Sequence, residues 1–169
     1  DQAAHLQARS AIVITGHGAT EVEAATVGAA SATGTFDLKF VRQEPQLGTG
    51  HAVQQAVPHL RDDGTVVVLS GDVPLTQADT LRALVAASAG GQLALLTVTL
   101  PDPTGYGRIV RNAEGAVQGI VEHKDATDAQ RAITEVYSGI MAVPARLLRG
   151  WLARLTNHNA QEIGRASCR

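Results

Sequence analysis

Hydrophobic and polar positions along the chain alternate in blocks that have the lengths of strands and helices. Apolar runs rich in β-branched residues predict strands at 11–15, 36–41, 65–71 and 92–100. The run at 65–71 is apolar without alternation, which is the pattern of a strand covered on both faces of a parallel sheet. Residues 19–30 and 77–88 have helical character, and Thr76 is the expected N-cap of the second helix.

The pattern changes after residue 100. Two strand-like runs, 106–111 and 116–122, are joined by Asn-Ala-Glu-Gly and predict a β-hairpin. A further strand at 135–143 leads into a helix whose apolar residues share one face, namely Leu147, Leu148, Trp151, Leu152 and Leu155. Strand–helix alternation followed by a hairpin insertion predicts an α/β domain of three layers.

Composition limits the class of protein. With 169 residues, of which 44% are apolar, the chain is long and apolar enough for one domain with a buried core. A net charge of −2 and an aromatic content of 3% argue against a nucleic-acid-binding protein, which needs a basic face and stacking rings. We find no apolar run of membrane-spanning length and no signal peptide, and the one cysteine, Cys168, cannot form an internal disulfide. The expected location is therefore the reducing cytoplasm, without a membrane partner.

Gly71 and Asp72 follow the apolar run and place a carboxylate at the carboxyl end of the predicted strand. Ligands of open α/β sheets bind at these strand ends. A carboxylate there suits Mg²⁺, which takes one or two carboxylates together with substrate phosphates. The alternative is that Asp72 only caps the turn into Pro74, and the residues alone leave both interpretations open.

A glycine-rich turn lies in the segment 44–57, where Gly48, Thr49 and Gly50 run into a helix-like stretch. Glycines adopt backbone angles closed to other residues, so the amides of such a turn can point at an anion or a base edge. Most turns of this kind hold no ligand, and the Gly-Lys-Ser/Thr of a phosphate-binding loop does not follow. The segment by itself is a weak signal.

Taken together, six segments resemble the N-acetylglucosamine-1-phosphate uridylyltransferase domain, the amino-terminal half of the bacterial bifunctional enzyme that makes UDP-N-acetylglucosamine. They occur in the family's order and close to its spacing, and they are QLGTGHA, GDVPL, LLTV, DPTGYGRI, GIVEHKDAT and WLARLTNHNAQ. The resemblance implies a Rossmann-like three-layer nucleotidyltransferase domain over residues 1–161, lacking the family's first strand and glycine-rich loop.

The resemblance also implies which residues bind the substrates. The positions that correspond to nucleotide-binding residues are Gln43, Gly48, Thr49, Ser70 and Gly71. Asp72 corresponds to the Mg²⁺ ligand and is the implied catalytic carboxylate. The positions that correspond to sugar-phosphate-binding residues are Gly107, Glu122 and Tyr137.

The chain departs from the family in several places. Ser70 stands where an aromatic residue often precedes Gly-Asp, and Tyr137 replaces an asparagine that touches the sugar. Arg108 and Lys124 have no implied role and are expected to be solvated charges. The glycine-rich loop with its arginine, and the lysine after it, are missing. Residues 162–169 match nothing in the family and are expected to be a non-native tail.

The implied activity is that of a UDP-N-acetylglucosamine diphosphorylase in peptidoglycan and lipopolysaccharide synthesis. The phosphate of N-acetylglucosamine 1-phosphate attacks the α-phosphorus of UTP, pyrophosphate leaves, and Mg²⁺ is the expected cofactor. Because the missing loop supplies several charges, the isolated chain is expected to be inactive. Without the first strand, exposed strand edges and poor solubility are expected. A homo-oligomer is expected only through a carboxyl-terminal half that this chain lacks.

Two other functions stay open at this stage. One is a related nucleotidyltransferase that transfers a thymidylyl, cytidylyl or guanylyl group to a sugar phosphate. The other is a non-catalytic nucleotide-binding module, which would bind UTP without needing Asp72 or Mg²⁺. The uridylyltransferase interpretation requires Asp72 to lie near residues 48–50 and to point away from the apolar core.

Overall fold

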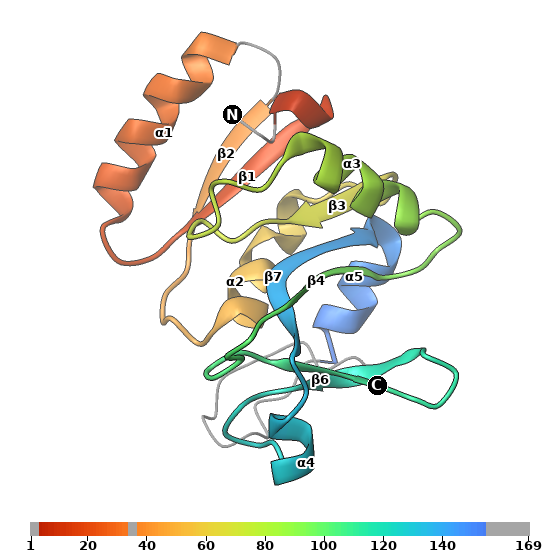
Figure 1. Ribbon diagram of the computed structural model, residues 1–169. Helices are drawn as coiled ribbons and strands as arrows, with labels where there is room; N and C mark the ends of the chain where they lie inside the picture. The colour runs from red at the N-terminus through yellow and green to blue at the C-terminus, as the bar shows by residue number, and fades with distance from the viewer. Residues whose placement is uncertain (1–3, 34–36, 155–169) are drawn as a thin grey trace.

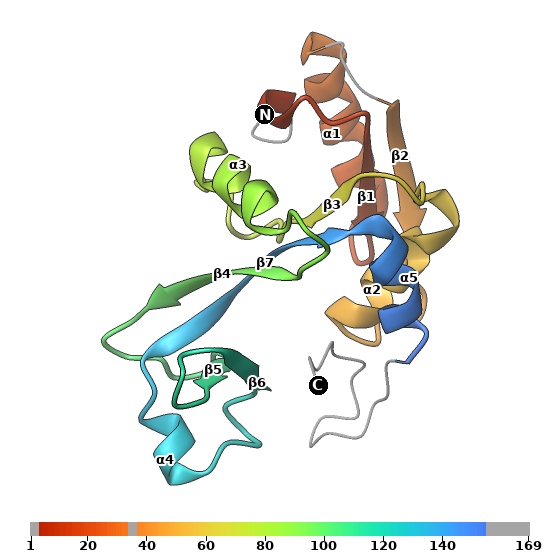
Figure 2. The same cartoon turned by 90° about the vertical axis from the view of Figure 1, so that its right-hand side faces the viewer.

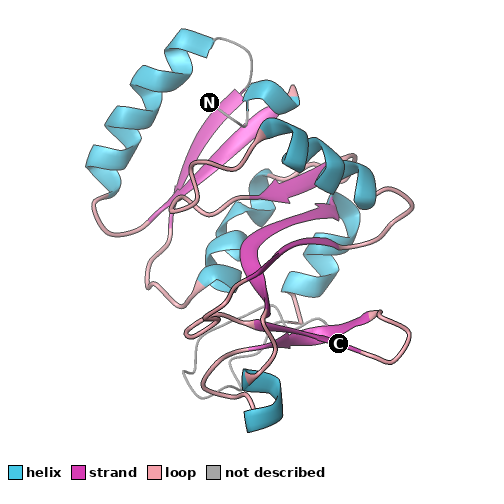
Figure 3. Ribbon diagram, in the orientation of Figure 1, coloured by secondary structure: helices cyan, strands magenta, loops and turns pink. Residues whose placement is uncertain are grey.

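The computed structural model describes residues 4–33 and 37–154 (Figures 1 and 3). The strands are β1 (Ser10–Thr15), β2 (Asp37–Arg42), β3 (Thr65–Val68), β4 (Ala94–Thr99), β5 (Arg108–Arg111), β6 (Val117–Val121) and β7 (Glu135–Pro144). The α-helices are α1 (Ala19–Thr33), α2 (Thr49–Ala56), α3 (Ala78–Ala87), α4 (Asp128–Arg131) and α5 (Ala145–Leu152). Two short 3-10 helices are η1 (Ala4–Leu6) and η2 (Val57–His59).

The described strands form two sheets. β1 and β2 pair in parallel, from Ser10 opposite Asp37 to Thr15 opposite Arg42. The other five strands form a second sheet, built around the long, curved strand β7, which runs through the middle of the molecule (Figure 1). β3 and β4 pair with β7 in antiparallel orientation, and the β5–β6 hairpin joins it where β5 begins.

Helices cover both faces of the larger sheet, so the predicted three-layer arrangement is confirmed for the described residues. The core cluster under α3 consists of Leu81, Leu84, Ala94, Ile140 and Ala142. The cluster under α2 and α5 consists of Val53, Val143, Leu148 and Leu152. Figure 2 shows α3 on one side of β7 and α2 with α5 on the other. No helix within residues 4–33 and 37–154 has the length and apolar character needed to cross a membrane.

Strand β3 is covered on both faces, as predicted, but its neighbour runs antiparallel. Val67 packs against the cluster under α3, whereas Val66 and Val68 pack against the cluster under α2 and α5. Its partner is β7, with Val68 opposite Met141. The prediction of a parallel neighbour is therefore wrong for the described strands. Burial on both faces gives a continuous apolar run whichever way the neighbouring strand runs, so hydrophobicity does not determine strand direction.

The remaining predicted elements are present, but some ends differ: β3 ends at Val68 and not at residue 71, so Asp72 lies four residues beyond the strand, and α4 was not predicted. The hairpin, the strand after it and both predicted helices are present. Thr76 is not the N-cap of α3; Gln77 occupies that position, and the Thr76 hydroxyl donates to the Val73 carbonyl at 3.1 Å. In α5, Leu148 and Leu152 are buried as predicted, whereas Leu155 lies outside the described residues. The expected tail, 162–169, also lies outside them.

Gly139, on β7, lies close to Ser70, which follows the end of β3. Its φ is 85°, and a Cβ there would lie 2.6 Å from Ser70 Oγ. We expect Gly139→Ala to lower the free energy of unfolding by about 2 kcal/mol, because the left-handed backbone is strained and Ser70 must move. Thermal unfolding measures the loss. Gly90→Ala is the matched control, since Gly90 has a φ of 81° but open space beside the added methyl.

The Gly139→Ala variant is expected to lose more stability than Gly90→Ala because of its contact with Ser70. Adding Ser70→Gly to the Gly139→Ala variant is expected to restore this additional part of the loss. Equal losses at Gly139 and Gly90 would show that the contact with Ser70 costs nothing.

Candidate functional site

The Gly48 turn joins β2 to α2. Gly48 is the N-cap of α2, with φ 90° and ψ 176°, a left-handed conformation that favours glycine. The first helical hydrogen bond runs from the amide of Ala52 to the Gly48 carbonyl at 3.0 Å. The N–H groups that precede Ala52 in the first turn therefore have no partner within the helix. Thr49 is exposed at this end and Gly50 is buried.

Gln43 fixes the Gly48 turn to the smaller sheet. The residue directly follows β2 and is only 8% exposed. Its backbone N–H donates to the Thr15 carbonyl at 2.8 Å, and its side-chain Nε2 donates to the Gly48 carbonyl at 2.9 Å. The same Nε2 lies 3.0 Å from Nδ1 of His51. The structure thus brings the predicted residues Gln43 and Gly48 together and adds His51, to which the sequence assigned no role.

Asp72 lies in an exposed turn that follows β3, together with Gly71. Its carboxylate makes no hydrogen bond or ion pair with any residue in the described part of the chain. Ser70, just before it, is half-buried and donates to the Gly139 carbonyl at 3.4 Å. Asp72 therefore points away from the apolar core. This is one of the two conditions of the uridylyltransferase interpretation. Contacts among the described residues do not join it to the Gly48 turn, so that proximity stays a prediction.

A single free carboxylate fits a metal ion that arrives with a phosphate ligand. Residues 4–33 and 37–154 contain no group of three or more His, Cys, Asp or Glu side chains placed to hold an ion. An all-protein metal cage is thus absent from this part of the chain. Mg²⁺ commonly binds through one or two carboxylates, several waters and substrate phosphates, a mode for which Asp72 is suited.

Gly107 and Glu122 lie side by side at the base of the hairpin. A Cβ on Gly107 would lie 2.8 Å from Ile120 Cγ2 and 3.5 Å from Glu122 Oε1. The amide of Tyr137, on β7, donates to the Gly107 carbonyl at 2.9 Å. The structure therefore brings the three residues predicted to bind the sugar phosphate to one place, although they are far apart in the sequence.

Arg108 is not the solvated charge that the sequence predicted. The residue is 1% exposed, and its guanidinium donates to the carbonyls of Tyr106 and Arg131. One guanidinium nitrogen also lies 3.1 Å from Nδ1 of His123. Its Nε is the one fully buried side-chain nitrogen or oxygen without a partner in the described residues. Lys124, in contrast, is exposed as predicted.

The Asp102 carboxylate is influenced by the charge of Arg108 but does not form an ion pair with it. The pKa of Asp102 is lowered, first by the hydrogen bonds from Thr104 and to a smaller extent by the nearby Arg108 guanidinium. Strand residues are assumed to alternate between faces, and a buried arginine next to an exposed loop is uncommon. This explains why the sequence pattern did not predict the burial of Arg108.

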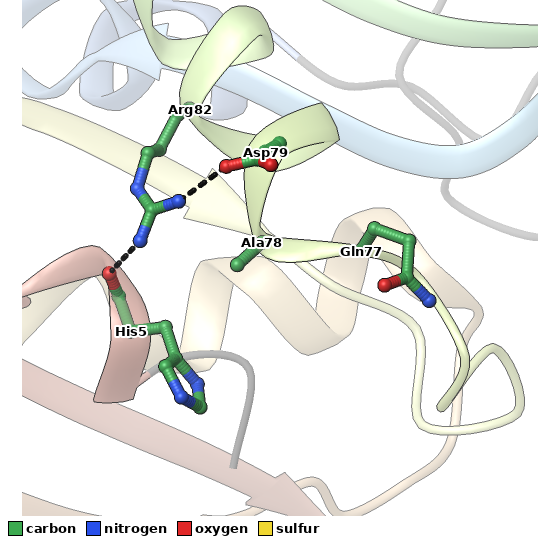
Figure 4. Close-up of a pocket in the computed structure, with 5 residues that line it drawn as sticks. All are labelled: His5, Gln77, Ala78, Asp79 and Arg82. Carbon is green, nitrogen blue, oxygen red and sulfur yellow. Dashed lines mark hydrogen bonds and ion pairs between the residues drawn. The ribbon is translucent and has the colours of Figure 1, made fainter.

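Two surface cavities lie away from the predicted site residues. One, of about 320 Å³, is lined by His5, Gln77, Ala78, Asp79 and Arg82 (Figure 4). Arg82 donates there to the Asp79 carboxylate and to the His5 carbonyl (Figure 4). The other, of about 310 Å³, is lined by Arg9, Ser10, Asp37, Lys39, His59 and Arg61. The candidate site therefore coincides with neither cavity.

The chain is similar to curated proteins over nearly its whole length. It is 79% identical over 160 residues to the "Bifunctional protein GlmU" of Acidovorax sp. (strain JS42), and 76% identical over 161 residues to that of Paracidovorax citrulli (strain AAC00-1). Each match covers 95% of this chain but only 34% and 33% of the relative. The chain thus spans about one third of the length of these relatives.

Solved structures show the same fold at low sequence identity. UDP-glucose pyrophosphorylase complexed with UDP-glucose matches with a TM-score of 0.69 and 14% identity, covering 96% of this chain and 68% of that one. HddC from Yersinia pseudotuberculosis matches with a TM-score of 0.61 and 16% identity, covering 89% of this chain and 64% of that one. The predicted nucleotidyltransferase fold is confirmed.

A family model, the MobA-like NTP transferase domain, matches residues 1–163. This range includes the Gly48 turn, Asp72 and the hairpin that carries Gly107. The match identifies the chain as a nucleotidyltransferase domain. The predicted relationship is confirmed, and the chain belongs to the MobA-like NTP transferase family, within which it corresponds to part of the bifunctional GlmU proteins.

Proposed function

We propose that a protein of the relatives' length containing this chain, called here the full-length protein, transfers the uridylyl group of UTP to N-acetylglucosamine 1-phosphate. The observation that carries this proposal is the 79% identity to a bifunctional GlmU protein over 95% of the chain. The six segments that resemble the uridylyltransferase domain support the choice of both substrates.

The nucleotide is proposed to bind at the Gly48 turn, through Gln43, Gly48 and Thr49, with Ser70 and Gly71 beside it. Gly48 has no side chain to hinder a base, and the amino end of α2 presents unpaired N–H donors. Carbonyl oxygens of a pyrimidine are suitable acceptors for these donors. Gln43 is held in place by the Gly48 carbonyl and adds a polar side chain to the same position.

The sugar phosphate is proposed to bind at Gly107, Glu122 and Tyr137. Because Gly107 lacks a Cβ, its backbone packs closely against Ile120 and Glu122, where a methyl group would be 2.8 Å from Ile120 Cγ2. Sugar hydroxyls can donate to the Glu122 carboxylate and exchange hydrogen bonds with the Tyr137 hydroxyl. These contacts would orient the acceptor phosphate.

The chemistry proposed is an in-line displacement at the α-phosphorus of UTP. A phosphate oxygen of the sugar phosphate forms a bond to this phosphorus while the bond to the pyrophosphate oxygen breaks, and the electron pair leaves with pyrophosphate. The protein positions the reactants and stabilises charge, without a covalent intermediate. Asp72 is the proposed ligand of Mg²⁺, which when bound neutralises charge on the phosphate oxygens.

A substrate matrix tests the proposal. The full-length protein is incubated with each of UTP, CTP, dTTP and GTP and with either N-acetylglucosamine 1-phosphate or glucose 1-phosphate, and pyrophosphate release is measured. We expect the highest kcat/KM for UTP with N-acetylglucosamine 1-phosphate. A higher value for another pair would identify a different nucleotidyltransferase. UTP binding that is insensitive to EDTA, without turnover of any pair, would indicate a non-catalytic module.

A further inference from the structure

Two glutamine side chains flank the imidazole of His51 at the start of α2. The Gln43 amide nitrogen lies 3.0 Å from Nδ1 of the ring, and the Gln55 amide nitrogen lies 3.0 Å from Nε2. His51 and Gln55 are half-buried, and Gln43 is buried. A neutral imidazole carries one N–H and one lone pair, so it cannot accept hydrogen bonds from both amides.

The Gly48 carbonyl holds the Gln43 amide in one orientation. A carbonyl oxygen only accepts, so the amide atom of Gln43 that lies 2.9 Å from it must be the nitrogen. The second hydrogen of this NH₂ group then points at Nδ1 of His51, which must accept it. The Gln55 amide nitrogen also lies on a carbonyl, that of His51, but at 3.2 Å, which is longer than the 2.9 Å between Gln43 and Gly48. The shorter contact favours the Gln43 orientation, so we place the ring proton on Nε2 and turn the Gln55 amide oxygen toward that proton.

The same geometry leaves the oxygen of Gln43 available to a ligand. Both amide hydrogens are used inside the protein, and Oε1 has no hydrogen-bond partner among the described residues. Oε1 is nevertheless not fully buried, because Arg108 Nε is the one fully buried unpaired side-chain atom in that part of the chain. The turn thus presents an acceptor at the end of α2, where the first N–H groups are donors.

We propose that His51 is a positioning residue that selects the nucleobase through Gln43. By accepting from Gln43 Nε2, the ring keeps Oε1 directed at the ligand. An acceptor beside donors complements uracil, which has N3–H between two carbonyl oxygens. Cytosine carries a lone pair at N3, which would face Oε1 unfavourably. Discrimination by a missing or misplaced hydrogen is stronger than discrimination by size. This inference rests on the proposed function, because it assumes that a pyrimidine nucleotide binds at the Gly48 turn.

The test measures the preference for UTP over CTP in the full-length protein, as the ratio of the two kcat/KM values. His51→Phe keeps the ring but removes both nitrogens, so the Gln43 amide loses one of its two anchors and is held only by the Gly48 carbonyl. We expect the ratio to fall on the order of tenfold, the effect of one hydrogen bond. His51→Asn is expected to restore most of the ratio, since Asn Oδ1 can accept in place of Nδ1.

A control separates base selection from a general weakening of α2. Gln54 is in the same helix, but its side chain donates to the Leu152 carbonyl at 2.7 Å and takes no part in the ring–amide contact. Gln54→Leu is expected to lower the melting temperature without changing the UTP/CTP ratio. The KM for N-acetylglucosamine 1-phosphate is expected to stay the same in all three variants. If His51→Phe does not fold, His51→Ala carries the same prediction, because it removes the ring without adding bulk.

The outcomes distinguish the two proposals. Absence of turnover with UTP in the unmodified protein would overturn the proposed function. Turnover with UTP, together with an unchanged UTP/CTP ratio in a folded His51→Phe or His51→Ala variant, would overturn the role of His51 alone. A lowered ratio that His51→Asn does not restore would also overturn it, since hydrogen-bond acceptance would then not be the cause.

Discussion

Replacing Asp72 by asparagine is expected to lower the rate of nucleotidyl transfer by about 10²–10³-fold in the full-length protein. The amide has nearly the same size but lacks the negative charge that a Mg²⁺ ligand provides. Asp72 is exposed, and its carboxylate has no partner among the described residues. The melting temperature is therefore expected to remain close to that of the unmodified protein.

The measurement is pyrophosphate release at several Mg²⁺ concentrations, with thermal unfolding on the same samples. Asp79→Asn is the matched control, because Asp79 is another exposed aspartate with a side chain that is 92% exposed. We expect this variant to keep its rate. Full activity of Asp72→Asn, or an equal loss in Asp79→Asn, would exclude Asp72 as the metal ligand and leave it as a turn residue.

Replacing Arg108 by alanine is expected to lower the free energy of unfolding by about 3 kcal/mol. The substitution leaves the carbonyls of Tyr106 and Arg131 without their donor and opens a cavity under the hairpin. Because Arg108 directly follows Gly107, the loss is expected to loosen the place proposed for the sugar phosphate as well. Denaturant unfolding followed by far-UV circular dichroism measures the change.

Arg111 supplies the matched control on the same strand. It forms two hydrogen bonds to Glu135, which lower the pKa of that carboxylate, but its side chain is 40% exposed. Arg111→Ala is expected to cost much less than Arg108→Ala, since exposed ion pairs contribute little. Arg108→Met retains much of the aliphatic volume and is expected to recover the part of the loss that comes from the cavity. Equal, small losses of unfolding free energy at both positions would show that burial of Arg108 does not contribute to stability.

Hydrophobic periodicity was sufficient to locate the strands and helices, because it reports which side chains are buried. The face of α5 that contains Leu148 and Leu152 and the covered strand β3 both follow from it. Strand direction does not, since Val66 to Val68 would be buried beside a neighbour of either orientation. The N-cap of α3 was misplaced by one residue because Thr76 uses its hydroxyl on the Val73 carbonyl.

The site was predictable only where residues are recognisable by type and position. The turn at Gly48 and the carboxylate of Asp72 were identified from local sequence and from the family resemblance. His51 was not, because its contact with Gln43 forms only when the end of β2 meets the start of α2. Arg108 was misassigned because a charged residue between exposed turns is normally solvated, whereas here three segments of the chain enclose it.

The described strands form two sheets, and α2 packs between them. No backbone ladder crosses from β1–β2 to β3–β7, and α2 packs against β1 and β2 as well as against α5. This helix, which begins at the Gly48 turn, therefore contributes to the cohesion of the two halves, together with the packing of Leu6 under α3 and the Arg9–Asp63 ion pair. By linkage, a small molecule that binds at that turn only while the halves are together stabilises their association. Each tenfold rise in its free concentration above the dissociation constant adds about 1.4 kcal/mol to the work of separating the halves.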